Sequence, residues 1–263
     1  MDGRKRDQDH PWSPGVNWPK GTQNVRRTIA ILRAVGGYGN RGAKLSEIAR
    51  TVALPTPTVK RILKAMAMES FLTVSPKSKH YYIGYDLYNL IKEARQFHLQ
   101  EVYRVALESL AEKTEDTVQL ITRSGFDAVC LDLVEGVRAV RFRYGIGSRL
   151  PLGLGCSGVV LLAFLPQEER ERVISINASR YRDHKVKPTQ VRAQIQEIQQ
   201  QGYNLRYEST IIEGMAGTAV PVFKDNAEVL ASITVISTSI RMSVHRCQKI
   251  AKLIEKEIKA LDQ

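Results

Sequence analysis

The pattern of apolar and polar positions in the first third of the chain predicts three helices followed by a hairpin. Apolar residues recur with the helical period over residues 23–35, 44–52 and 56–67. Gly36-Gly37 is expected to end the first helix, and the tight link Ala53-Leu54-Pro55 separates the second from the third. Two short runs, 71–75 and 80–83, flank Pro76-Lys77-Ser78-Lys79 and are predicted to pair as a two-stranded hairpin.

The residues before the second and third helices suggest how each helix begins. Ser46 is the predicted N-cap of the second helix, and Glu47 suits the positive end of its dipole. Thr56 is the predicted cap of the third helix, with Pro57 in the first helical position, where no backbone donor is lost.

The rest of the chain alternates between strand and helix patterns. An amphipathic helix over 85–98 is predicted to link this part to the first. We then expect helices over 101–113, 155–164, 189–201 and 242–261, and strands over 117–123, 127–134, 138–145, 215–223 and 228–237. Consecutive strands with helices at the edges favour an antiparallel α+β domain.

Four segments follow from these patterns. Residues 1–21 mix Pro, Gly, Asp and Arg without a period, and we expect a mostly disordered arm. Residues 22–84 form the first predicted domain, 85–98 the linker helix and 99–263 the second domain.

Charge separates the two predicted domains. The net charge of the chain is +12. Residues 1–84 hold 15 Lys or Arg against 5 Asp or Glu, a net of +10, whereas 85–263 hold 24 against 22, a net of +2. Such a concentration is expected when one module meets a polyanion, although a solvated basic surface has the same composition.

Two short helices, a tight turn and a hairpin with a basic tip together predict a winged helix-turn-helix. Its second helix would enter the major groove of double-stranded DNA, so short polar and long basic side chains are needed near the start of that helix. The candidate DNA-binding residues are Arg26, Arg27, Ser46, Thr56, Pro57, Thr58, Lys60, Arg61, Lys64, Lys77 and Lys79. A small helical subdomain with a basic surface is the alternative.

Three stretches resemble the IclR family of bacterial transcription regulators, in the same order and with similar spacing. The first is LSEIARTVALPTPTVKRILKAM with FLTVSPKSKHYYIG, the second is RLPLGLGCSGVVLLAFLP, and the third is QGYNLRYE with GMAGTAVPVF and LASITVIS. Pro57 stands where the family usually has Ser, and Val159 where it usually has Lys.

The resemblance implies a sequence-specific transcriptional regulator with a GAF-like effector-binding domain, assembled as a homodimer or a dimer of dimers. It also implies the pocket positions Leu150, Cys156, Ser157, Met215, Gly217, Thr234 and Ile236. Independently of the family, the stretch from Gly153 to Gly158 suits close approach of a ligand, and this adds Gly155.

The expected effector is a small organic acid, and aromatic acids are among the candidates. The backbone N–H groups that open the helix at 155 favour an anion. Arg141, Arg143 and Arg149 lie just upstream and would add positive charge.

Other residues leave an enzyme or a redox sensor as the alternative class. Cys156 near a helix start would be the reactive thiol, with the basic domain as an accessory. The three cysteines are far apart and the histidines form no HxH or HxxxH pair, so we expect no metal and no cofactor. No apolar run is long enough to span a membrane and no signal sequence is evident, so the cytoplasm is the expected location.

Overall fold

The computed structural model describes residues 19–92, 97–138, 145–224 and 228–261. The chain divides into two compact units, with the division between Phe97 and His98. Each unit is described by itself below.

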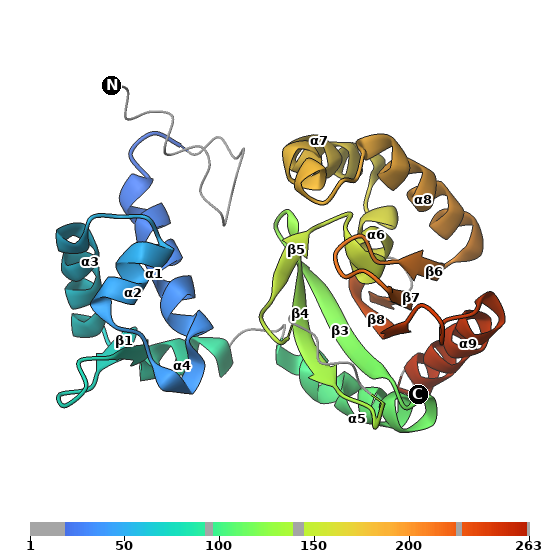
Figure 1. The fold of residues 1–263 in the computed structure, drawn as a ribbon, viewed down its shortest axis with the longest axis horizontal. Helices are drawn as coiled ribbons and strands as arrows, with labels where there is room; N and C mark the ends of the chain where they lie inside the picture. The colour runs from blue at the N-terminus through green and yellow to red at the C-terminus, as the bar shows by residue number, and fades with distance from the viewer. Residues whose placement is uncertain (1–18, 93–96, 139–144, 225–227, 262–263) are drawn as a thin grey trace. The chain divides into compact units, whose positions relative to one another are not determined.

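The first unit is a small helical body with a β-hairpin (Figure 1). Its helices are α1 (Gln23–Gly37), α2 (Leu45–Thr51), α3 (Thr56–Met68) and α4 (Tyr85–Lys92), with a short 3-10 turn at Gly39–Arg41. The hairpin consists of β1 (Leu72–Val74) and β2 (Tyr81–Ile83), which pair antiparallel. One apolar core joins α1, α2, α3 and β1, and its largest fully buried side chains are Ile31, Ile48, Leu63 and Leu72.

Both predicted helix caps were wrong by one or two positions. Helix α2 begins at Leu45, so Ser46 lies inside it and Lys44 is the N-cap. An isolated bridge pairs Ala43 with Tyr81 in extended geometry, and the backbone N–H of Lys44 then donates to the Glu47 carboxylate at 2.8 Å. The chain is therefore free to turn into a helix one residue after the bridge.

Helix α3 likewise begins one residue early. Thr56 is its first residue and makes no capping hydrogen bond, whereas the extended Pro55 is the N-cap. Pro57 thus occupies the second helical position, where its missing N–H is still outside the helix ladder.

The second unit is a six-stranded antiparallel sheet covered by helices on both faces (Figure 1). The strand order is β5-β4-β3-β8-β7-β6. The elements in chain order are α5 (Phe97–Thr114), β3 (Thr117–Ser124), β4 (Asp127–Val134), β5 (Arg149–Pro151), α6 (Gly155–Ala163), α7 (Gln167–Asp183), α8 (Pro188–Gln201), β6 (Asn204–Glu208), β7 (Met215–Lys224), β8 (Glu228–Thr238) and α9 (Val244–Leu261).

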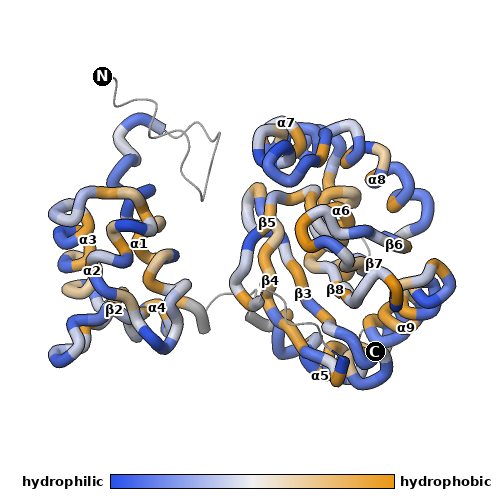
Figure 2. Tube along the Cα trace, viewed as in Figure 1, coloured by the Kyte–Doolittle hydropathy of each residue, from blue (hydrophilic) through white to orange (hydrophobic). Residues whose placement is uncertain are grey.

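Two apolar cores lie on opposite faces of this sheet. Helices α5 and α9 pack on the face that carries Val118 and Leu120. Helices α6, α7 and α8 pack on the other face, which carries Ile121 and Cys130. Helix α6 is hydrophobic along almost its whole length because it lies between the sheet and its neighbours (Figure 2). The antiparallel α+β expectation for this unit is confirmed.

The sequence pattern missed three elements of this unit. Helix α7 was not predicted, and neither were the short strands β5 and β6. The predicted strand 138–145 falls largely on residues 139–144, which lie outside the described residues. The last helix begins at Val244, two residues later than expected.

Within the described ranges of the chain, no helix has the length and apolar content that crossing a membrane requires.

Candidate ligand pocket and nucleic-acid interface

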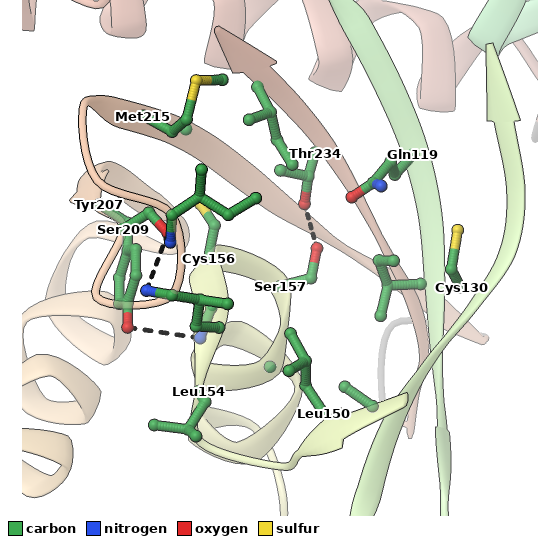
Figure 3. Close-up of a pocket in the computed structure, with 18 of the residues that line it drawn as sticks. Gln119, Cys130, Leu150, Leu154, Cys156, Ser157, Tyr207, Ser209, Met215 and Thr234 are labelled. Atoms are coloured by element: carbon green, nitrogen blue, oxygen red, sulfur yellow. Dashed lines mark hydrogen bonds between the residues drawn. The ribbon is translucent and has the colours of Figure 1, made fainter. Parts of the chain in front are cut away.

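A cavity of about 110 Å³ lies between the sheet and helix α6 (Figure 3). Strands β3, β4, β7 and β8 supply one wall, and the start of α6 with the β6–β7 loop supplies the other. All eight candidate pocket residues line it, and these are Leu150, Gly155, Cys156, Ser157, Met215, Gly217, Thr234 and Ile236. Segments more than 60 residues apart in sequence thus meet around one space.

The alternation of strand side chains explains which residues face the cavity. Lining residues on β3, β4 and β8 are two apart, as Gln119 and Ile121 are on β3, whereas on β7 Ala216 lines the cavity as well as Met215 and Gly217. The register places Gln119 opposite Thr234, and Gly217 opposite Ile236. Residues two apart point to the same face of a sheet, so this face is the floor of the cavity.

The turn before α6 is held in place by α7. Gly153 has a φ of +101°, and a Cβ atom there would overlap the hydroxyl group of Tyr181. That hydroxyl donates to the Leu152 carbonyl at 2.5 Å, and the buried Asn177 amide donates to the same carbonyl at 3.2 Å and to that of Phe126 at 2.8 Å. The helix that the sequence pattern missed therefore positions one wall of the pocket.

Hydroxyl groups provide most of the polar lining. The Ser157 and Thr234 hydroxyls are hydrogen-bonded to each other across the cavity (Figure 3). The Gly155 N–H donates to the Tyr207 hydroxyl at 3.3 Å, so the first amide of α6 is already occupied. Burial raises the pKa of Tyr207, which keeps that hydroxyl protonated.

Two neutral thiols line the same cavity. Burial raises the pKa of Cys130 to about 12 and that of Cys156 well above its ordinary value. The thiolate is the reactive form, so burial opposes the nucleophile or redox role considered for Cys156. In the described part of the chain, no group of three or more His, Cys, Asp or Glu residues is placed to hold a metal.

None of the described residues that line the cavity carries a charged side chain. The expectation that Arg149 adds positive charge is wrong, because its guanidinium pairs with Asp127 at 3.0 Å and donates to Ser124 at 3.1 Å. Arg141 and Arg143 lie outside the described residues.

The loop between β6 and β7 closes the cavity and was not part of the predicted site. Its residues Ser209, Ile211 and Ile212 line the pocket. The loop is fastened at both ends to Ser239, whose N–H donates to the Gly214 carbonyl and whose hydroxyl donates to the Glu208 carboxylate, both at 2.8 Å. Gln119, Cys130 and Tyr207 were missed as well, although the two-residue alternation on β3 and β4 would have indicated the first two.

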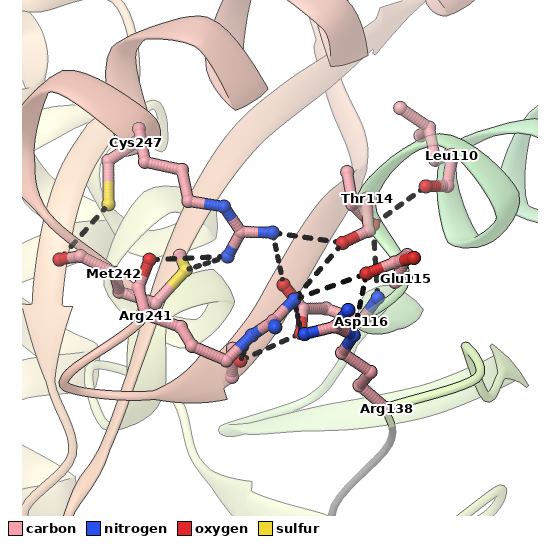
Figure 4. Close-up of polar contacts among 10 residues, drawn as sticks. Leu110, Thr114, Glu115, Asp116, Arg138, Arg241, Met242 and Cys247 are labelled. Atoms are coloured by element: carbon pink, nitrogen blue, oxygen red, sulfur yellow. Dashed lines mark hydrogen bonds and ion pairs between the residues drawn. The ribbon is translucent and has the colours of Figure 1, made fainter.

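A buried carboxylate ties the end of β8 to the junction of α5 and β3 (Figure 4). Asp116 is 1% exposed and pairs with Arg246 at 2.7 Å and with Arg241 at 3.2 Å. It also accepts a hydrogen bond from Ser237 at 2.8 Å. Since β3 and β8 both line the pocket, this cluster fixes the ends of two pocket strands.

In the first unit, most of the candidate DNA-binding residues lie at the surface. Thr58, Arg26 and Arg27 are half-buried, and the exposed ones are Ser46, Thr56, Pro57, Lys60, Arg61, Lys64, Lys77 and Lys79. Helix α3 buries Val59, Ile62, Leu63 and Met66 on its opposite side. The hairpin tip between β1 and β2 carries Lys77 and Lys79.

The fold and these sites define a winged helix-turn-helix protein with a separate ligand-pocket unit. The model of the IclR helix-turn-helix domain matches residues 24–76, and that of the bacterial transcriptional regulator IclR C-terminal domain matches residues 91–263. The chain therefore belongs to the IclR family of bacterial transcriptional regulators.

Curated relatives agree with this family assignment. The probable transcriptional regulator SauR of Cupriavidus necator is 29% identical over 221 residues, which are 83% of this chain and 86% of SauR. The regulator KipR of Bacillus subtilis is 26% identical and covers 80% of this chain and 85% of its own.

Solved structures show the same fold. An IclR homologue from Microbacterium hydrocarbonoxydans, complexed with 4-hydroxybenzoate, has a TM-score of 0.71 at 23% identity, covering 90% of this chain and 100% of that one. The Thermotoga maritima IclR structure has a TM-score of 0.62 at 19% identity, with 91% and 97% covered.

Proposed function

We propose that α3 and the β1–β2 hairpin bind a double-stranded DNA operator and that a small molecule in the pocket controls this binding. The observation that carries the proposal is the convergence of eight residues from the second and third of the stretches that resemble the family on one cavity, in a chain whose other unit is a winged helix-turn-helix. A ligand changes operator affinity only by binding one conformational state more tightly than another.

Surface position and charge support the DNA contacts. Lys60, Arg61 and Lys64 are exposed on the face of α3 opposite its buried residues, and Thr56 and Pro57 lie at its start, where recognition helices meet base edges. Lys77 and Lys79 at the hairpin tip suit neighbouring phosphates.

Replacing Lys60 and Arg61 with Ala tests this interface. We expect specific operator retardation to be lost while the thermal unfolding midpoint stays unchanged, because both side chains are exposed. The control is K185A/K187A in the second unit, which removes the same charge from exposed positions. Unchanged retardation by K60A/R61A would count against the recognition-helix assignment.

For the effector we propose a compact aromatic acid. Apolar side chains such as Leu150, Leu154 and Met215 suit a ring, and the hydroxyls of Ser157 and Thr234 suit a carboxylate or phenol. The 4-hydroxybenzoate held by the Microbacterium homologue is a ligand of this kind. The helix start supplies the positive potential that no side chain of the described lining provides.

Calorimetric titration with three matched compounds tests the ligand class. We expect 4-hydroxybenzoate to bind more tightly than 4-hydroxybenzamide, and 4-hydroxybenzylamine not to bind. Binding of the amide or amine alone would contradict an acid. The variant T234V keeps the side-chain shape and removes one hydroxyl, and it should weaken binding of the acid about tenfold, equivalent to about 1.4 kcal/mol.

We further propose a homodimer or dimer of dimers in the cytoplasm, where a bacterial regulator meets its DNA. Two α3 helices would then enter successive major grooves about 34 Å apart. Light scattering with and without operator DNA tests the assembly, and a monomer on a single half-site would contradict it.

A further inference from the structure

Helix α9 carries a row of lysines on the side that faces away from the sheet. Its buried residues are Cys247, Ile250, Ala251 and Ile254, which pack against the sheet with α5. Lys249, Lys252, Lys256 and Lys259 are all exposed. At about 100° per residue the four fall within one narrow arc opposite the buried side, and we call them the lysine ridge.

The ridge lysines differ from the arginines of this unit that form ion pairs. Arginines there are used in ion pairs that hold the fold, and these are Arg104, Arg123, Arg138, Arg149, Arg180, Arg192, Arg241 and Arg246. Among the described residues, no carboxylate forms an ion pair with any lysine of the ridge. The Glu257 carboxylate instead forms an ion pair with Lys113 at 2.6 Å. Glu255 is half-buried and lies at the edge of the ridge.

This concentration stands out because the unit is nearly neutral. Residues 85–263 carry 24 basic and 22 acidic side chains, a net of +2. Four positive charges within about 15 Å of helix therefore form a local field that the rest of the unit does not share.

We propose that the lysine ridge is a second DNA-contacting surface, which binds the phosphate backbone of double-stranded DNA outside the bases read by α3. A duplex carries one phosphate per about 3.4 Å of axis on each strand, so about 15 Å of helix faces about four phosphates. Lysine suits this contact because it acts as a mobile point charge and needs no fixed geometry.

The composition of the ridge favours DNA over a protein partner. Protein interfaces are enriched in aromatic residues and Arg and depleted in Lys at their centres. The ridge has four lysines, and its arc also holds the exposed His245 but no exposed Phe, Tyr, Trp or Arg. A phosphate backbone requires charge alone.

The salt dependence of operator binding tests the ridge in the full-length protein. The variant K249Q/K252Q/K256Q/K259Q is compared with R182Q/K185Q/K187Q/K224Q, which removes four exposed charges that are not aligned on one helix face. The logarithm of the binding constant falls linearly with the logarithm of the salt concentration. On a long duplex with the operator at its centre, each lost phosphate contact makes this slope less steep by about 0.9. We expect the ridge variant to lose about 3–4 units of slope for each protomer whose ridge contacts the duplex, and the control to lose less than 1.

The second part of the experiment uses a short duplex that ends at the operator. There the parent and the ridge variant should bind equally, because the flanking phosphates are absent. Equal slopes for both proteins on the long duplex would overturn the proposal. Equal slopes together with lost transcription activation by purified RNA polymerase would assign the ridge to an acidic protein surface instead, and would also overturn it.

The inference rests on the proposed operator binding, and the two can fail separately. If the unmodified protein retards no DNA selected from a random pool, the proposed function fails. If it does bind and the ridge variant is indistinguishable from it, only the ridge assignment fails.

Discussion

At the scale of single residues, glycine and buried polar groups determine the shape of the pocket. Gly153 is required twice, because its φ of +101° is unfavourable for other residues and its missing Cβ leaves room for Tyr181. Asn177 and Tyr181 both donate to the Leu152 carbonyl in the turn that leads into α6. The geometry of the cavity thus depends on residues that do not touch a ligand.

The variant G153A should be destabilised by about 3 kcal/mol or more, since backbone strain and overpacking add. The control is G202A, where φ is +85° and a Cβ would have no atom within 4 Å. That variant should lose only about 1 kcal/mol from backbone strain. Urea unfolding of both measures the difference, and equal losses would show that Tyr181 accommodates the methyl group.

The buried thiols give the stability a defined pH dependence. Burial raises the pKa of Cys130 to about 12, so above about pH 9 the unfolded chain loses a proton that the folded state keeps. The stabilisation is complete below that pH and is lost as pH rises toward 12. We expect C130A to show a free energy of unfolding that falls less steeply, by about 1.4 kcal/mol per pH unit, than that of the parent between pH 9 and 11. Parallel curves would contradict the burial of this thiol.

At the scale of elements, apolar periodicity predicted the helices with a clear stripe and missed α7, which has none. Helices α1, α3 and α9 have such a stripe and were found within two or three residues. Helix α7 buries Val173, Ile174, Asn177 and Tyr181 among many charged residues, so a polar side chain interrupts its stripe. Strand β5 has only three residues, which is too short for alternation to be visible.

The predicted pocket residues lie in stretches with a recognisable pattern, and the missed residues of the β6–β7 loop do not. Leu150, Cys156, Ser157 and the positions on β7 and β8 came from the family resemblance, Gly155 came from the glycine pattern, and all of them line one cavity in the structure. Ser209, Ile211 and Ile212 come from a loop without a period, and only the closed tertiary structure brings them over the cavity. The two-residue alternation indicates which face a strand residue occupies but not what covers that face.

Helix α7 should control ligand affinity without contacting the ligand. The variant N177A leaves the Phe126 and Leu152 carbonyls short of a donor and should cost about 2–4 kcal/mol of stability. Its affinity for the effector should fall several-fold because the α6 turn loosens. In Y181F one donor is lost and both Asn177 bonds remain, so a smaller effect is expected. Calorimetry at a temperature where both variants are folded makes the comparison, and unaltered affinity in N177A would contradict this positioning role.

At the scale of the molecule, the Asp116 cluster and the Ser239 contacts join the pocket to the start of α9. Ser239 holds the loop that closes the cavity, and two residues later Arg241 reaches Asp116 at the end of α5. We expect a ligand that moves the closing loop to act along this path, through Ser239 and the chain that joins it to Arg241, on the Asp116 cluster. The family assignment was predictable from sequence, whereas this path was not, because its groups are spread over more than 120 residues.

Two variants at different points of this path should affect different properties, one mainly the free energy of unfolding and the other mainly the rate of effector release. The variant R246M removes one of the ion-pair partners of Asp116. Its free energy of unfolding should be lower by about 3 kcal/mol, as expected when a buried carboxylate loses a partner. The variant S239A should cost about 1 kcal/mol and accelerate effector release, because the loop loses its hydrogen bond at Glu208 and keeps only the backbone bond at Gly214. Stopped-flow dissociation measures the second effect, and an unchanged release rate in S239A would contradict the role of Ser239.

Lysines and arginines occupy different places in this protein, and this difference affects how the protein responds to chemical modification. The charges that hold the second unit together belong mainly to arginines, whereas the ridge and much of the exposed charge of α3 and the hairpin belong to lysines. Acetylation neutralises lysine and leaves arginine charged. Mild treatment with an acetylating reagent should therefore weaken DNA binding while the protein stays folded, because it removes the charge of the lysines at the proposed DNA contacts and leaves that of Arg61 and of the arginines that support the fold.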